Sequence, residues 1–233
     1  MKVTDPKENR RMFDEIARSY DRANFFISLG RYKAWYRMLI NMSGVQKGGK
    51  VLDCASGTGN VAIEFKRSLG DDVQVTGVDV ADKMLEIARK KANNQGYHID
   101  FHNEDILNMS FPNNSFDVAT ITFGIRNTIS IEDTLSELAR VVRKGGKVLI
   151  LETGEIKGIK RFLYNIYQKV YVNQIGRLLS GHNNAYEWLS ESSNDFPSGY
   201  RFVKIMNKSL LFSSTTYKKM MFGSIFLYIG EVK

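Results

Sequence analysis

The sequence is poor in residues and segments that mark several protein classes. Its 233 residues include one cysteine, three prolines and three histidines. The lone Cys54 excludes an internal disulfide and suits a reducing compartment. No stretch approaches the roughly 20 apolar residues that span a bilayer, and the first eight residues lack the apolar core of a signal peptide. We expect a cytoplasmic protein that touches a membrane only from outside, and we assign no metal ligands.

Charge is unevenly distributed along the chain. The formal net charge is +8, from 33 basic and 25 acidic side chains. Residues 1–50 hold 11 basic and 5 acidic side chains, residues 51–156 hold 11 and 16, and residues 157–233 hold 11 and 4. An acidic middle therefore lies between two basic flanks. This surplus favours an anionic partner, which could be nucleic acid, a membrane surface or an acidic substrate.

Helical patterns open the chain, and strand and helix patterns alternate after residue 50. Apolar residues recur at helical spacing from Met12 to Tyr20 and again over 33–42. Expected strands lie at 50–53, 73–78, 98–102, 118–123 and 147–151, and expected helices at 61–69, 81–92 and 131–142. Such alternation predicts a single α/β domain with a parallel sheet and helices on both faces. Gly145-Gly146 ends the expected helix at 131–142. After Glu152 we expect an aromatic-rich helix at 159–172 and late antiparallel strands near 209–212 and 225–229.

A glycine-rich turn follows the first expected strand. It reads Asp53-Cys54-Ala55-Ser56-Gly57-Thr58-Gly59-Asn60 and directly precedes a helix. Glycines let backbone amides approach a ligand closely, and a helix N-terminus favours a negative group. Gly57, Gly59 and Ala62 also match the G-x-G-x-x-A form of the dinucleotide fingerprint.

Three acids refine this nucleotide site. Asp79 ends the second expected strand, where a carboxylate can bind both hydroxyls of a ribose, and Asp105 follows the third, where it can accept from an adenine amine. Asp53 stands four residues before Gly57, a placement typical of methyltransferases rather than dehydrogenases. A pyrophosphate suits a neutral or positive site, whereas the sulfonium of S-adenosylmethionine tolerates these acids. The sequence therefore favours S-adenosylmethionine as cofactor.

Several motifs, in order along the chain, resemble the ubiquinone/menaquinone biosynthesis C-methyltransferase family. The first is the entry helix Met12-Phe13-Asp14-Glu15-Ile16-Ala17 with Tyr20-Asp21. More specific are the segments 111–117 (FPNNSFD), 123–127 (FGIRN), 180–197 and 222–230. The chain departs from the family pattern at His182, at Ser190 and at Thr153-Gly154-Glu155. These departures lie on the expected substrate side and leave the particular quinol open.

The resemblance implies a Rossmann-like, doubly wound, mostly parallel seven-stranded sheet with a helical substrate cap. We divide the single domain into an N-terminal helical cap (1–49), a cofactor-binding core (50–156), a substrate-covering helical insertion (157–200) and terminal strands (201–233). The implied activity is C-methylation of a prenylated quinol (demethylmenaquinol or a polyprenyl benzoquinol). The expected cofactor-binding residues are Tyr20, Asp53, Gly57, Thr58, Gly59, Asp79, Asp105, Ile106 and Thr122.

Methyl transfer to a quinol carbon requires an ionised hydroxyl next to that carbon, and a phenol has a pKa near 10. The fixed positive charge of Arg126 is our first choice to stabilise the phenolate. We expect Asn127 to orient the quinol oxygen or a water, and His182 to be a candidate base by position.

Alternative functions remain open at this stage. One is a methyltransferase for another small molecule on the same fold, and a less favoured one is an RNA-binding or RNA-modifying protein. Because a polyprenyl quinol lives in a membrane, the basic flanks predict transient contact with an anionic membrane surface rather than with nucleic acid. The oligomeric state stays open, a homodimer included.

Overall fold

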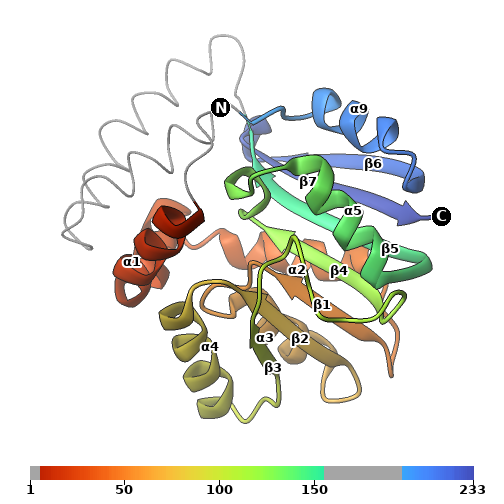
Figure 1. The fold of residues 1–233 in the computed structure, drawn as a ribbon. Coiled ribbons are helices and arrows are strands. Elements are labelled where there is room, and N and C mark those ends of the chain that lie inside the picture. The colour runs from red at the N-terminus through yellow and green to blue at the C-terminus, as the bar shows by residue number, and fades with distance from the viewer. Residues whose placement is uncertain (1–5, 155–195) are drawn as a thin grey trace.

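The computed structural model describes residues 6–154 and 196–233, and this part of the chain forms a seven-stranded sheet (Figure 1). The strands are β1 (Lys50–Cys54), β2 (Gln74–Asp79), β3 (Asp100–Asn103), β4 (Phe116–Thr122), β5 (Val142–Thr153), β6 (Phe212–Met220) and β7 (Ile225–Val232). Their order is β3-β2-β1-β4-β5-β7-β6. The five neighbouring strands β3, β2, β1, β4 and β5 pair in parallel, and β7 runs antiparallel between β5 and β6. The mostly parallel seven-stranded sheet is confirmed.

Helices cover both faces of this sheet. The helices are α1 (Pro6–Ile27), α2 (Tyr32–Ser43), α3 (Asn60–Leu69), α4 (Asp82–Asn94), α5 (Ile131–Val141) and α9 (Tyr200–Lys208), with short 3₁₀ turns η1 (Ile125–Asn127) and η3 (Met221–Gly223). Val148 and Ile150 of β5 face the core under α5 and α9, whereas Leu149 and Leu151 face the core under α2 and α3. All four are fully buried, as expected for a strand covered on both sides. None of these helices is long and apolar enough to cross a membrane.

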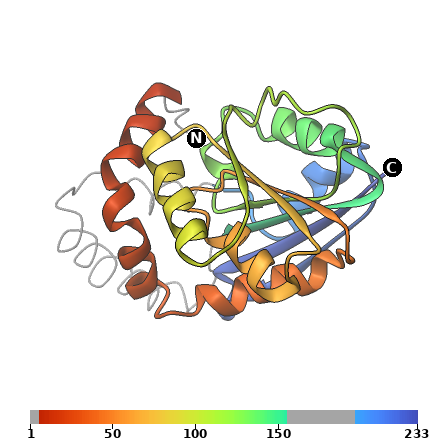
Figure 2. The ribbon, with the colours of Figure 1, turned by 90° about the horizontal axis from the view of Figure 1, so that it is seen from below.

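Helix α1 lies beside α4, at the end of the sheet where the parallel strands finish (Figure 2). Ile16, Ala17 and Ala23 form its buried stripe and pack against Ala81 and Met84 at the start of α4. This apolar contact holds the middle of α1. The polar side chains of the same helix are thereby brought over the carboxyl ends of the strands.

We expected Gly145-Gly146 to separate a helix from a strand, but the pair lies within β5. Helix α5 ends at Val141, and β5 begins at once and includes Gly145 and Gly146. Gly145 has a positive φ of 73°, and a Cβ on Gly146 would lie 2.5 Å from the carbonyl oxygen of Asp117. The pair therefore forms an irregularity within the strand, where the register with β4 shifts.

The C-terminal boundaries also needed correction. The range 201–233 contains helix α9 in addition to strands, and β6 begins at Phe212 rather than near residue 209. Ser209 is the C-cap of α9, and the exposed Leu210 has a positive φ of 60°. Strand β6 is an edge strand rich in Ser, Thr and Lys, so it carries no apolar run to detect. The expected helix at 159–172 and most of the expected insertion at 157–200 lie outside the described residues.

Candidate active site

The two glycines of the β1–α3 turn serve different purposes. Both have positive φ, 54° at Gly57 and 76° at Gly59. A Cβ on Gly57 would meet no atom within 4 Å, because this residue faces a cavity. A Cβ on Gly59 would lie 2.9 Å from the Cβ of Ala88, so this residue permits close packing of the turn on α4. Only Gly57 is therefore exposed to a ligand.

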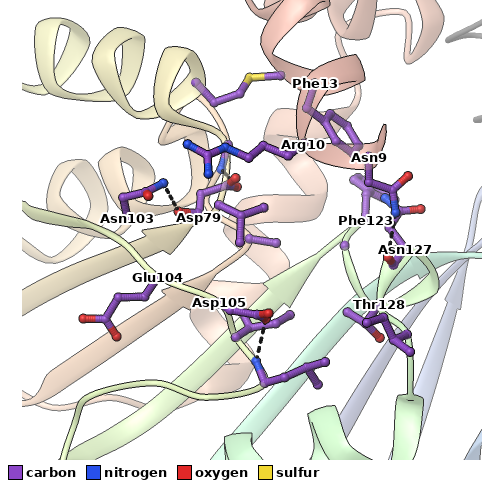
Figure 3. Close-up of a pocket in the computed structure, with 18 of the residues that line it drawn as sticks. Asn9, Arg10, Phe13, Asp79, Asn103, Glu104, Asp105, Phe123, Asn127 and Thr128 are labelled. Carbon is purple, nitrogen blue, oxygen red and sulfur yellow. Dashed lines mark hydrogen bonds between the residues drawn. The ribbon is translucent and has the colours of Figure 1, made fainter. Parts of the chain in front are cut away.

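The carboxylate of Asp79 is fixed at the end of β2. One oxygen accepts a hydrogen bond from the backbone N–H of Gly57 (2.8 Å) and the other from that of Ala81 (2.9 Å). Burial raises the pKa of Asp79, and the two amide hydrogen bonds oppose that shift. The side chain is thus held rigidly between the glycine turn and the start of α4, with the cavity in front of it (Figure 3).

This cavity has a volume of about 400 Å³ and lies between α1 and the carboxyl ends of the central strands. Seven of the expected site residues line it: Tyr20, Gly57, Asp79, Asp105, Ile106, Thr122 and Asn127. Within the described residues, the buried Oγ1 of Thr122 and Oδ1 of Asn127 have no hydrogen-bond partner. Buried polar atoms are normally paired, so two unpaired ones at a cavity indicate a place for a polar ligand.

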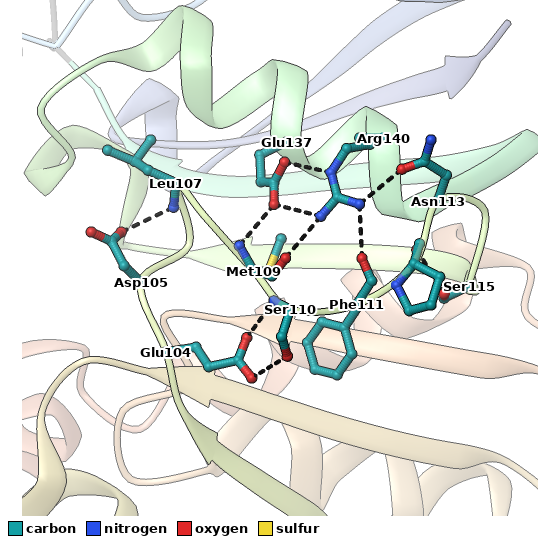
Figure 4. A network of polar contacts seen from close by, with 11 residues as sticks. Glu104, Asp105, Leu107, Met109, Ser110, Phe111, Asn113, Ser115, Glu137 and Arg140 are labelled. Carbon is teal, nitrogen blue, oxygen red and sulfur yellow. Dashed lines mark hydrogen bonds and ion pairs between the residues drawn. The ribbon is translucent and has the colours of Figure 1, made fainter.

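A polar network fixes the wall that carries Asp105 and Ile106 (Figure 4). Arg140 of α5 donates to the carbonyl oxygens of Met109 (3.0 Å) and Phe111 (2.8 Å). Glu137 accepts from the N–H of Met109 (2.8 Å), and its pair with Arg140 lowers the pKa of this carboxyl group. Sequence reasoning missed this pair, although Glu137 and Arg140 stand three residues apart on one helix face. Asp105 itself accepts from the N–H of Leu107 (2.9 Å).

Asp53, Thr58 and Gly59 do not line the cavity, contrary to expectation, and instead support the turn from behind. Asp53 is 1% exposed and accepts from the Oγ1 of Thr120 (2.9 Å) and the N–H of Ala62 (3.2 Å). Burial raises the pKa of Asp53 to about 7. Asp53 thus joins β1, β4 and the start of α3. A direct contact of these three residues with a cofactor stays a prediction.

A second unforeseen cluster joins α1 to the glycine turn through Asp21. Its Oδ1 accepts from the Oγ1 of Thr58 (2.6 Å) and the Nδ2 of Asn60 (2.8 Å), and its Oδ2 pairs with the ammonium of Lys91 (2.7 Å). Burial lowers the pKa of Lys91, and the charge of Asp21 opposes this effect. The cluster locks α1, the turn and α4 together at one side of the cavity.

The first half of α1 forms the roof of the cavity. Asn9 donates from Nδ2 to the carbonyl oxygen of Asn127 (3.1 Å), and Arg10 pairs with Asp82 on the opposite wall. Figure 3 shows Asn9 and Arg10 pointing to these two sides. Tyr20, further along the helix, also lines the cavity, and burial raises its pKa. One helix therefore closes the cavity from wall to wall.

Arg126 lies beside the cavity but does not line it. It donates from Nη1 to Oε1 of Glu152, and the two side chains are 6% and 0% exposed. Asn127, the next residue, does line the cavity, so the structure brings one of the two expected catalytic side chains that it describes to the cavity. His182 lies outside the described residues. No group of three or more His, Cys, Asp or Glu side chains in the described part of the chain could hold a metal ion.

The residues of the cavity fit S-adenosylmethionine. Carboxylates of Asp79 and Asp105 stand at its wall, Gly57 leaves open space, and the unpaired Oγ1 of Thr122 offers a polar contact. The volume lies within the usual range of small-molecule sites. The carboxyl edge of a doubly wound sheet is also where such folds bind ligands.

Comparison with known proteins agrees with this geometry. The model of the ubiE/COQ5 methyltransferase family matches residues 1–232. The chain is 40% identical to the ubiquinone/menaquinone biosynthesis C-methyltransferase UbiE of Bdellovibrio bacteriovorus over 230 residues, which is 98% of this chain and 97% of that protein. It is 34% identical to the demethylmenaquinone methyltransferase of Bacteroides fragilis, over 93% of this chain and 89% of that protein.

Solved structures resemble the chain in fold. A SAM-dependent methyltransferase from Thermotoga maritima superposes with a TM-score of 0.67 at 17% identity, over 96% of this chain and 99% of that one. A SAM-dependent methyltransferase from Methanococcus maripaludis gives a TM-score of 0.65 at 18% identity, over 94% of both chains. The sheet described above is thus the methyltransferase sheet of these proteins.

Proposed function

This chain belongs to the ubiE/COQ5 methyltransferase family, and from that premise we propose that it methylates a ring carbon of a prenylated quinol, with S-adenosylmethionine as the methyl donor. The observation that carries the proposal is the cavity under α1, where the side chains of Asp79, Asp105 and Asn127 converge at the carboxyl edge of the sheet. Relatives named for quinone biosynthesis match nearly the whole chain, which supports a demethylmenaquinol or polyprenyl benzoquinol as acceptor.

Different residues of the cavity suit different parts of the cofactor. The rigid carboxylate of Asp79 suits the two ribose hydroxyls, Asp105 suits the adenine amine, and the buried Ile106 suits the face of the ring. Tyr20 and Thr122 line the remaining part. When bound there, S-adenosylmethionine supplies a methyl group on a cationic sulfur. The chain itself contributes orientation, which can lower such a barrier by about 7–11 kcal/mol.

The acceptor must be ionised next to the reacting carbon. Asn127 can orient the quinol hydroxyl, because its buried Oδ1 has no partner in the described residues and can accept a hydrogen bond. Arg126 places a fixed positive charge one residue away, which favours the phenolate over the neutral phenol. We assign charge stabilisation to Arg126 and orientation to Asn127. His182 remains a candidate base.

The prenyl tail of such an acceptor requires access to a membrane. The basic segments 1–50 and 157–233 can meet an anionic lipid surface, each basic residue contributing about 1 kcal/mol. We therefore propose peripheral, salt-sensitive membrane contact. Cosedimentation with vesicles of anionic lipid at low and high salt tests it. Equal recovery with neutral and anionic vesicles would remove this part of the proposal.

Two substitutions test the function. Asp79→Asn should abolish cofactor binding in titration calorimetry, because it removes the charge that faces the ribose hydroxyls. Arg126→Ala should keep cofactor binding and lose turnover of a short-chain demethylmenaquinol. Asp71→Asn, in an exposed position before β2, serves as the matched control and should change neither. Wild-type turnover in Arg126→Ala would refute the mechanism.

A methyltransferase for a different small molecule is the second candidate. The departures from the family pattern at His182, Ser190 and Thr153-Gly154-Glu155 favour it. A panel of demethylated benzoquinols and naphthoquinols, assayed with one cofactor concentration, distinguishes the two. Turnover of none of these quinols, with cofactor binding intact, would favour the second candidate.

A further inference from the structure

A buried ion pair stands behind the turn that leads into the cavity. Arg126 of η1 donates to Glu152, the residue before the last in β5, and neither side chain is more than 6% exposed. Charges are rarely buried this deeply unless they are paired, and their pairing then fixes the geometry. Because Asn127 follows Arg126 directly and lines the cavity, the pair also defines where this turn sits.

The carboxylate of Glu152 is used unevenly. Its Oε1 accepts from the N–H of Thr153 (2.7 Å), from the Oγ1 of Thr153 (3.1 Å) and from Arg126. Its Oε2 is buried and has no hydrogen-bond partner in the described part of the chain. These three donors therefore gather on the same oxygen of Glu152.

Titratable groups of two other elements face this pair. Tyr228 of β7 pairs in register with Ile150 and lies fully buried, and its hydroxyl accepts from the N–H of Gly199 (2.6 Å). Burial raises the pKa of Tyr228, and the charge of Glu152 raises it further. Tyr20 of α1 lines the cavity, and the charge of Arg126 lowers its pKa against the larger effect of burial. The field of Arg126 therefore reaches the cavity, although its side chain does not line it.

We propose that Glu152 is a positioning residue for the methyl transfer, which holds the guanidinium of Arg126 and balances its charge beside the acceptor hydroxyl. This inference rests on the proposed function, because it needs Arg126 to act on an ionising acceptor. Glu152 does not touch the acceptor in this scheme. Glu152 fixes the position of the guanidinium of Arg126 and partly neutralises its charge, and both affect the ionisation of the acceptor hydroxyl.

Neutralising Glu152 has a defined direction of effect. In Glu152→Gln, the side-chain shape and one acceptor oxygen remain, but the positive charge of Arg126 is no longer balanced. The phenolate is then favoured more strongly, so the pKa of the acceptor hydroxyl falls. We expect the rise of kcat with pH to move to lower pH by about one unit. Glu152→Ala removes the anchor itself and should lower kcat about tenfold at little-changed KM.

The experiment measures kcat and KM of the full chain against pH, with a short-chain demethylmenaquinol and saturating S-adenosylmethionine. The variants are Glu152→Gln, Glu152→Ala and Arg126→Ala. Glu64→Gln is the matched control, because Glu64 of α3 is also a buried glutamate, paired with Arg37 of α2 and Arg67 of α3. Thermal unfolding and cofactor calorimetry accompany each variant, so that a loss of folding is seen directly.

A shift in Glu152→Gln that is absent from Glu64→Gln supports the proposal. An unshifted profile in Glu152→Gln, together with lost turnover in Arg126→Ala, overturns the role of Glu152 and leaves the proposed function intact. Wild-type turnover in Arg126→Ala overturns both.

Discussion

Asp53 should make the protein less stable as the pH rises toward 7. Its pKa is about 7 in the folded chain because burial disfavours the charged form, against about 3.8 when unfolded. Between these two values the folded state holds a proton that the unfolded state has lost. Raising the pH through this window therefore favours unfolding, and above the folded pKa the loss is complete.

The magnitude follows from the width of that window. About 3 pKa units at about 1.36 kcal/mol each give roughly 4 kcal/mol as an upper bound at pH 8. About 2–3 kcal/mol of it should appear between pH 5 and pH 8, since part of the loss has already occurred by pH 5. Asp53→Asn should remove this pH dependence, because the amide oxygen can still accept from Ala62 and its NH₂ can donate to Thr120.

Urea unfolding at pH 5 and pH 8 measures this difference. The wild-type chain should lose stability over this range relative to Asp53→Asn, and Asp71→Asn, which alters an exposed aspartate before β2, should follow the wild type. Parallel wild-type and Asp53→Asn profiles would show that the carboxyl group is not desolvated as described.

Four further substitutions have defined outcomes. Gly57→Ala should bind the cofactor poorly in calorimetry, because its Cβ would enter the cavity, and should lose about 1–2 kcal/mol in urea unfolding, because its positive φ disfavours a side chain. Gly59→Ala should lose about 1–3 kcal/mol more, because its φ is also positive and its Cβ would crowd Ala88; a smaller loss for Gly59→Ala than for Gly57→Ala would contradict the roles assigned to the two glycines. Arg140→Met should raise the KM for the cofactor several-fold by freeing the wall that carries Asp105, and an unchanged KM would disprove that link. Lys91→Met should weaken cofactor binding and lower Tm by leaving Asp21 without its cation, which thermal unfolding and calorimetry check together.

Local patterns in the sequence were enough to predict the cofactor half of the fold. Strand–helix alternation and the glycine turn place Asp79 and Asp105 at strand ends, and both line the cavity. These residues are defined by their immediate neighbours along the chain, which is why single-sequence reasoning reaches them.

Side-chain partners far apart in sequence were not predictable in the same way. Asp53 turns inward to Thr120, 67 residues away, and Arg126 turns to Glu152, 26 residues away. No periodicity signals such pairings, because they arise only when the strands are assembled. The bounds of β6 were not predictable for a different reason, because an edge strand of Ser, Thr and Lys has no apolar face to mark it.

The antiparallel strand β7 belongs to a part of the sheet that is separate from the lining of the cavity. Every lining residue of the cavity found in the described chain precedes β5, from α1 to Ile129, whereas β5, β7 and β6 contribute none. The pairing of Thr153 with Ile225 also brings η3 to the edge where β5 ends. Sequence changes there leave the residues that line the cavity unchanged, so we expect them to spare the binding of the methyl donor.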